Sequence, residues 1–160
     1  MNPGEFEARI MAAAPRYYRI AKAILRCDAD CEDAMQEAMI KAWTNLRKLK
    51  DPNYFETWMC RILINECNTL LRRSKRRATV ALSDAIPQPE PPDPMLWEAL
   101  QRIGIQHRVP LVLHHANGYS LAEAARILNL PVSTVKWRIH RGKQMLSALL
   151  QKEWEYNESV

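Results

Sequence analysis

The sequence predicts an all-α protein made of two small helical bundles, and three observations lead to this prediction. Apolar residues recur with helical spacing along most of the 160-residue chain. The chain has only four glycines, and no Asn-Gly or Asp-Gly pair joins two alternating apolar runs as a β-hairpin would require. Half of the ten prolines fall between Pro87 and Pro94, a density that neither a helix nor a central strand tolerates.

This proline-rich segment divides the chain into three parts. It is expected to form an extended linker over residues 79–94, between a first domain over residues 1–78 and a second over residues 95–160. The formal charge is +5 in the first domain, −3 in the linker and +3 in the second domain. Because both domains are basic and the linker is acidic, contact with nucleic-acid phosphates is expected from the domains.

Helical periodicity predicts about four helices in each domain. In the first domain they are expected near residues 4–14, 16–27, 30–49 and 53–74. In the second domain they are expected near residues 94–103, 107–117, 120–128 and 132–151. No internal repeat is found.

The composition also excludes several classes of protein. No run of 18 apolar residues exists, and Glu5 and Glu7 interrupt the N-terminus, so a cytoplasmic protein without membrane insertion is expected. The four cysteines form no CxxC pair and have no histidine at zinc-finger spacing, so neither a metal nor a cofactor is expected. Since Cys27 and Cys31 would share a helix face, a redox pair or metal site is the alternative to small apolar residues in a reducing compartment.

The helix predicted over residues 30–49 has two unlike sides. Its apolar stripe consists of Ala34, Met35, Ala38, Met39, Ala42, Trp43, Leu46 and Leu49. The opposite side carries Asp33, Gln36, Glu37 and Lys41, a polar ridge of acidic character in a basic domain. From the pattern alone, a solvated face is the favoured interpretation.

The helix predicted over residues 53–74 carries a row of hydrogen-bond donors. The row consists of Thr57, Arg61, Asn65, Asn68 and Arg72, and a basic cluster, Arg72, Arg73, Ser74, Lys75, Arg76 and Arg77, follows it. Amide and guanidinium groups can bind base edges and phosphates. Tyr54, Phe55 and Trp58 lie near the start of the helix, and aromatic groups beside basic ones suit unstacked bases. Phe55 and Trp58 also fall on the apolar stripe, so burial in the core is favoured for both.

The second domain contains the pattern of a helix-turn-helix. Leu121, Ala124, Ala125 and Leu128 share a face of a short helix, and Asn129-Leu130-Pro131 follows as a tight turn, since Asn tolerates the left-handed conformation. Ser133 is expected to cap the next helix. The outward face of that helix carries Lys136, Trp137, His140, Arg141, Lys143 and Gln144, with no acid between Val132 and Lys152. This imbalance favours DNA binding, and for Trp137 an anchor for a protein partner is the alternative.

Together these stretches resemble the extracytoplasmic-function sigma factors of the sigma-70 family. DCEDAMQEAMIKAW is similar to the family's DxxQE-type helix, and FETWMCRILINECNTLLRR is similar to its FxTWLxRIxxN segment. After the linker, YSLAEAARILNLPVSTVKWRIHRGKQML resembles the final helix-turn-helix with its PVxTVxxRxxR signature. The three motifs in this order, with a linker between them, are much more specific than any one alone.

The resemblance implies a role for each part. Asp33, Gln36 and Glu37 would contact the clamp helices of the β′ subunit of core RNA polymerase, in place of a solvated face. Arg61, Asn65, Asn68, Arg72 and Arg73 would read and melt the minus-10 element of promoter DNA, with Tyr54 to Trp58 near the melted strand. Lys136, Trp137, His140 and Arg141 would read the minus-35 element as a duplex. The resemblance also implies control by an anti-sigma factor.

Some features depart from the family pattern, and two other classes of protein remain as alternatives. Trp137 stands where small residues are usual and Ser133 where Gly is common, which affects the expected minus-35 preference. A stand-alone helix-turn-helix regulator would leave the DxxQE-like ridge and the aromatic-basic helix without a role. An enzyme acting on nucleic acid would need convergent carboxylates or a His–Cys set, whereas the acids are expected on outward helix faces or in the linker.

Overall fold

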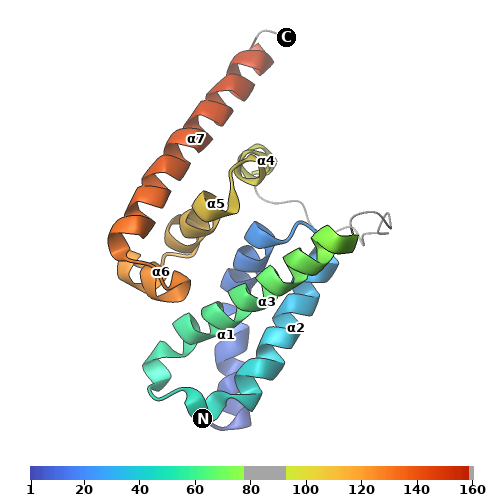
Figure 1. Cartoon of the computed structure of the whole chain (residues 1–160), viewed down its shortest axis with the longest axis vertical. Coiled ribbons are helices and arrows are strands. Elements are labelled where there is room, and N and C mark those ends of the chain that lie inside the picture. Colours follow the sequence, from blue (N-terminus) through green and yellow to red (C-terminus); the bar gives the residue numbers. More distant parts are fainter. Residues whose placement is uncertain (78–92, 159–160) are drawn as a thin grey trace. The chain divides into compact units, whose positions relative to one another are not determined.

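A computed structural model describes residues 1–77 and 93–158 of the chain, and every regular element in these two ranges is a helix. The chain divides into two compact units, the first built on α1–α3 and the second on α4–α7 (Figure 1). The first contains α1 (Pro3–Ile24), α2 (Asp28–Thr44), the 3₁₀ turns Leu46–Lys48 and Pro52–Tyr54, and α3 (Phe55–Arg77). The second contains α4 (Pro94–Arg102), α5 (Ile105–Leu111), a π-helical turn (Val112–Ala116), α6 (Leu121–Leu128) and α7 (Val132–Glu158).

The first unit has three α-helices rather than about four, because α1 runs through Pro15 without a break. The prediction of separate helices over 4–14 and 16–27 was wrong for a tertiary reason. Pro15 is exposed, so water can solvate the carbonyl that loses its hydrogen bond, while Tyr17 and Ile20 are buried on the other side. Asn2 and Glu5 form a capping box that fixes the start of α1.

The joint between α1 and α2 is a small polar network. Lys22 Nζ lies 2.6 Å from Asp28 Oδ1, and the Tyr18 hydroxyl donates a hydrogen bond to the same oxygen. Burial acts to raise the pKa of Asp28, but the hydrogen bonds from Lys22 and Tyr18 outweigh it and hold the pKa below its ordinary value. The network therefore orients α2 where it leaves α1.

The core of the first unit depends on small residues in α2. Ala34, Ala38 and Ala42 are fully buried, so α2 comes close to α1 and α3, against which it packs in Figure 1. Met59 and Leu63 of α3 fill the interior beside them. Trp43 was expected on this buried stripe but is 45% exposed, because α2 already ends at Thr44 and the indole lies at its margin against Phe6.

The cysteines of this core favour the interpretation as small apolar residues. Cys31, Cys60 and Cys67 are buried. Burial raises the pKa of both Cys31 and Cys67 to about 12, which disfavours the reactive thiolate. Within the parts of the chain that the structure describes, no three His, Cys, Asp or Glu side chains gather closely enough to hold a metal ion.

The second unit is tied together by a buried cation. Arg108 of α5 is 4% exposed, and its Nη1 donates to the carbonyl of Ile103 at 2.7 Å and to that of Gln101 at 3.2 Å. These carbonyls lie at the C-terminal end of α4, where a positive charge interacts favourably with the helix dipole. Asp93 caps the opposite end of α4 through the backbone of Leu96. The short helix α4 is therefore held at both ends.

The predicted linker over 79–94 lies almost entirely outside the described residues, as do the side chains of Lys75, Arg76 and Arg77 in the basic cluster. Among the described helices, none is both long enough and apolar enough to cross a membrane.

Candidate nucleic-acid interface

The polar row of α3 lies on the surface of the first unit. Arg61, Asn65, Arg72 and Arg73 are exposed, and Asn68 is half-buried among them. Arg72 Nη2 donates a long hydrogen bond, 3.5 Å, to the Thr69 hydroxyl. The row thus presents amide and guanidinium groups that can bind a second molecule.

The ridge of α2 also faces outward. Asp33, Gln36 and Glu37 are exposed, while Ala34 and Ala38 between them are buried. The three polar side chains therefore form a surface distinct from the α3 row, with an acidic rather than a basic character. Lys41, which the sequence placed on this ridge, instead crosses to α3, where its Nζ lies 2.5 Å from Glu66 Oε1.

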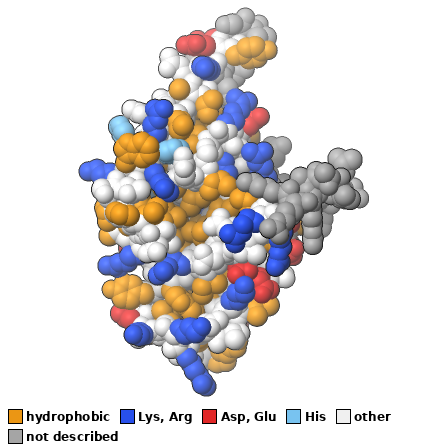
Figure 2. All heavy atoms as spheres, viewed as in Figure 1, with side chains coloured by type: hydrophobic (Ala, Val, Ile, Leu, Met, Phe, Trp, Pro, Cys, Tyr) orange, Lys and Arg blue, Asp and Glu red, His pale blue; other side chains and the backbone are white. Residues whose placement is uncertain are grey.

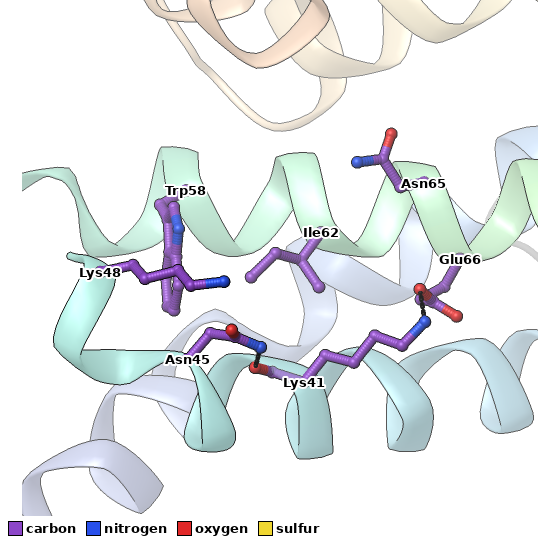
Figure 3. A pocket seen from close by; sticks show the side chains of 7 residues that line it. All are labelled: Lys41, Asn45, Lys48, Trp58, Ile62, Asn65 and Glu66. Atoms are coloured by element: carbon purple, nitrogen blue, oxygen red, sulfur yellow. Dashed lines mark hydrogen bonds and ion pairs between the residues drawn. The ribbon is translucent and has the colours of Figure 1, made fainter.

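Between α2 and α3 lies a pocket of about 270 Å³ (Figure 3). Its lining consists of Lys41, Asn45, Lys48, Trp58, Ile62, Asn65 and Glu66. Trp58, Ile62 and Glu66 follow one another along α3, and the Asn65 amide points away from the Lys41–Glu66 pair (Figure 3). Trp58 is half-buried rather than part of the closed core, so its ring borders the pocket, whereas Phe55 is buried as expected.

Glu66 is a residue that the sequence reasoning missed. The acids were expected on outward faces or in the linker, but Glu66 is 8% exposed. Its position one residue after Asn65 turns it from the exposed row toward α2, where Lys41 compensates its charge. The spacing of 25 residues between the partners gives no local signal of the pair.

The helix-turn-helix of the second unit is formed by α6, a tight turn and α7. Asn129 has φ of 53°, the left-handed conformation that was predicted for it. Ser133 is not the cap residue, because α7 already begins at Val132 and places Ser133 in its first turn. Ala124 and Val135 are fully buried, which lets the two helices cross closely.

The outward face of α7 carries the side chains expected there. Lys136, His140 and Arg141 are exposed, and Trp137 is 61% exposed. The centroid of the Trp137 ring lies 5.9 Å from that of the His107 ring, so the indole also packs against α5. Arg141 Nη1 donates to Gln144 Oε1 at 3.4 Å, and Gln144 Nε2 lies 3.3 Å from His140 Nε2. Cations, an imidazole, an amide and an indole thus share one face.

The buried side of α7 fixes how closely this helix approaches α5. A Cβ at Gly142 would lie 2.8 Å from Leu111 Cδ1 and 3.2 Å from His107 Cβ, so glycine permits the contact. His107 Nδ1 lies 3.1 Å from the carbonyl oxygen of Arg138, which adds a polar contact between the same helices. On the face drawn in Figure 2, Lys and Arg side chains are spread over both units and acidic side chains are fewer.

Comparisons with known proteins give the family. Residues 10–77 match Sigma-70 region 2, and residues 94–146 match Sigma-70, region 4. The chain is 31% identical over 138 residues to the ECF RNA polymerase sigma factor SigM of Mycobacterium tuberculosis, covering 83% of this chain and 70% of that protein. It is 28% identical to the ECF RNA polymerase sigma-E factor of Escherichia coli, covering 94% and 91% of the two chains. The chain belongs to the extracytoplasmic-function sigma factors of the sigma-70 family.

Solved structures have the same fold as this sigma factor. The sigma factor RpoE of Bartonella quintana, in complex with the anti-sigma factor NepR, superposes with a TM-score of 0.79 at 22% identity, covering 92% of this chain and 97% of that one. CnrH, in complex with the cytosolic domain of CnrY, gives a TM-score of 0.73 at 28% identity, covering 94% and 90% of the two chains. As an RNA polymerase sigma factor, the protein serves transcription initiation by binding and is not an enzyme.

Proposed function

We propose that the two units of this sigma factor divide promoter recognition between them. Residues 1–78 act as the region that binds core polymerase and opens the minus-10 element, and residues 95–160 read the minus-35 element. The observation that supports this division is the difference between the exposed faces. The face of α3 lies beside a pocket with an aromatic wall, while the face of α7 is an open row of cations on a helix-turn-helix.

Asp33, Gln36 and Glu37 are proposed to bind the β′ clamp of core polymerase. All three are exposed on α2, and their acidic character differs from the basic row of α3. A surface that repels phosphate suits a protein partner better than DNA. This leaves α3 of the same unit available for the promoter.

Arg61, Asn65, Asn68, Arg72 and Arg73 are proposed to bind the minus-10 element. The guanidinium groups suit the backbone phosphates, and the amides suit the edges of unstacked bases. Lys136, Trp137, His140 and Arg141 are proposed to face the major groove of the minus-35 element, where a recognition helix of a helix-turn-helix lies. Two domains on one chain gain from effective concentration even when each binds weakly alone.

An anti-sigma factor is proposed as the regulator of this protein in the cytoplasm. The support is that two solved sigma factors with the same fold are bound to the anti-sigma factor NepR and to the cytosolic domain of CnrY. Co-purification of the chain from its native cells, followed by mass spectrometry, tests for such a partner.

The proposed division is tested by run-off transcription with purified core polymerase, with promoters found by sequencing the 5′ ends of the transcripts. We expect transcripts whose promoters share one motif near −35 and another near −10. A gel shift with the pure protein is the matched comparison, and little binding is expected without core enzyme. Tight site-specific binding by the pure protein, with no transcription on addition of core, would instead indicate a stand-alone regulator.

A further inference from the structure

His107 is a buried polar residue of α5 that the roles proposed above do not use. It is 4% exposed, and its Nδ1 lies 3.1 Å from the carbonyl oxygen of Arg138 in α7. Because a carbonyl oxygen only accepts, Nδ1 carries the proton, and Nε2 is left to accept from the Gln106 amide at 3.4 Å. A Cβ at Gly142 would lie 3.2 Å from His107 Cβ, so α7 also limits the movement of this side chain. The imidazole therefore has a fixed orientation beside α7.

Trp137 combines a contact with this fixed ring and a large exposed surface. The two ring centroids lie 5.9 Å apart and the ring planes meet at 54°, a separation at which aromatic rings attract each other. The rest of the indole is open, since Trp137 is 61% exposed. An exposed tryptophan without such a contact would populate several rotamers, and ordering it on binding would cost affinity. The His107 ring thus holds an apolar side chain ready on the outward face of α7.

The chemistry of the major groove limits what an indole can recognise there. The bases of a duplex are stacked, so a side chain in the groove meets only their edges. Apart from hydrogen-bond donors and acceptors, the distinguishing group on those edges is the 5-methyl group of thymine. An indole has a single N–H donor and is otherwise apolar. Contact with a thymine methyl group therefore makes the best use of the exposed surface of Trp137.

We propose that Trp137 selects one thymine of the minus-35 element through its 5-methyl group, and that His107 is the positioning residue that holds the indole for this contact. The inference rests on the proposed function, because only a recognition helix brings Trp137 into the major groove. His107 itself is too buried to reach a base, so it acts through the indole. An anchor for a protein partner, the other use of an exposed tryptophan, would not depend on a methyl group of the DNA.

The experiment uses holoenzyme assembled from core polymerase and the full chain, with a promoter identified by run-off transcription. Each thymine of the minus-35 element, on either strand, is replaced in turn by deoxyuridine, which lacks only the methyl group. For the wild-type protein, we expect one position at which this loss weakens binding about fourfold, as the burial of one methyl group implies. Trp137→Ala should bind thymine and deoxyuridine at that position equally well.

Two variants of His107 separate positioning from folding. His107→Asn keeps a donor for the Arg138 carbonyl but loses the ring, whereas His107→Phe keeps a ring but loses the donor. We expect His107→Asn to lower the factor at that thymine to less than about twofold and His107→Phe to retain more of it. The salt dependence of binding, which reports the phosphate contacts, should stay unchanged in both. Glu98→Gln, at an exposed acid of α4, is the matched control and should keep the fourfold factor.

A spectroscopic measurement tests the ring contact without DNA. In the full chain labelled with fluorotryptophan, the fluorine resonance of Trp137 is identified by its absence in Trp137→Phe. Its chemical shift should move in His107→Asn but not in Glu98→Gln, because the shift depends on the neighbouring ring. Circular dichroism and thermal melting establish which variants are folded, and His107→Gln replaces His107→Asn if the latter unfolds. A resonance that stays in place without the imidazole would overturn the positioning role.

The outcomes separate the inference from the function on which it rests. If the wild-type holoenzyme prefers certain minus-35 bases but no replacement by deoxyuridine weakens its binding, Trp137 does not read a methyl group and the proposed function stands. If Trp137→Ala removes the effect of the methyl group but both His107 variants keep it in full, His107 does not position the indole. If the wild-type holoenzyme shows no base preference in the minus-35 element, the proposed role of α7 fails, and the inference fails with it.

Discussion

The two units expose polar side chains from their helices in different ways. In the first, an acidic ridge on α2 and a basic row on α3 occupy separate surfaces, and a buried acid lines the pocket between the helices. In the second, the outward face of α7 carries two cations, an imidazole and an indole in one open row. The first arrangement provides two surfaces of opposite charge and a recess, whereas the second provides one convex surface that suits a groove. Similar small helical frames can therefore present very different chemistry.

The largest effect is expected at the acids of α2, whose charge is opposite to that of the basic row on α3. Replacing both Asp33 and Glu37 with Ala should weaken the affinity for core polymerase roughly thirtyfold, because each loses a charge-assisted contact. Helix content should stay intact, since both side chains are exposed and their removal opens no cavity. Titration of labelled protein with core polymerase measures the effect, and Glu7→Ala is the control. Unchanged affinity in the double variant would mean that this ridge does not bind core polymerase.

An effect of about tenfold is expected on the neighbouring surface, at Asn65. Asn65→Ala should slow or weaken open-complex formation more than closed-complex binding, because an amide that pairs with an unstacked base is used only after melting. Permanganate reactivity of thymines in the melted region reports the open complex, and a gel shift at low temperature reports the closed one. Asn68→Ala should act in the same direction. Normal permanganate reactivity in both variants would mean that neither amide is a reader.

Smaller and more selective effects are expected on the face of α7. Lys136→Ala or Trp137→Ala should change the preferred bases of the minus-35 element, with a loss of severalfold at one position. Arg141→Ala should weaken binding to all sequences alike. It should also make the slope of log affinity against log salt concentration shallower by about one, as loss of a phosphate contact does. Transcription from a library randomised at the minus-35 element, at two salt concentrations, distinguishes these outcomes.

Lys152→Ala, at an exposed cation near the end of the same helix, is the matched control and should behave as the wild type. If the variants at 136, 137 and 141 all keep wild-type base preference, salt dependence and yield, α7 is not the DNA reader. The second unit would then have no DNA-binding face on α7 to compare with the surfaces of the first unit.

The smallest effect is expected on the folding stability of the first unit rather than on its binding surfaces. Asp28→Asn should lower the free energy of unfolding by about 1 kcal/mol at pH 7, since it weakens charge-assisted bonds from Lys22 and Tyr18. A carboxyl whose pKa is lowered by folding stabilises the folded state above its unfolded pKa, here ordinarily 3.8, and this contribution is lost as the pH falls through the folded pKa. The difference between variant and wild type should therefore narrow below about pH 4 in urea unfolding experiments. Glu37→Gln, at an exposed acid, is the control and should change the stability little. If the difference in unfolding free energy between Asp28→Asn and the wild type stays constant to low pH, the ionic explanation is contradicted.

Much of the fold could be predicted from local patterns in the sequence. The helical class and the turn at Asn129 follow from the spacing of apolar residues and from the tolerance of Asn for a positive φ. The break expected at position 15 was wrong, because local propensity cannot show that Tyr17 and Ile20 bury a continuous face while Pro15 faces water. Tertiary packing therefore keeps α1 continuous at Pro15, although the local propensity of proline favours a break.

The candidate site could also be predicted only in part. The exposed row of α3 and the face of α7 each lie on a single helix, so helical spacing in the sequence predicted which residues share each face. The Lys41–Glu66 pair joins two helices, and no rule of helical spacing places those residues together. Trp58 was expected in the core, but only the packing of α2 against α3 determines that its ring borders a pocket.

Gly142 bears on how this family member can diversify. The contact that sets the depth of α7 against α5 lies on the side of the helix opposite Lys136, His140 and Arg141, which are exposed. If Lys136, His140 and Arg141 read the minus-35 element as proposed, promoter preference can change at these positions without disturbing the contact at Gly142. A library randomised at 136, 140 and 141 should yield folded proteins with new minus-35 preferences, whereas larger residues at 142 should force α7 away from Leu111 and misplace every reading side chain together.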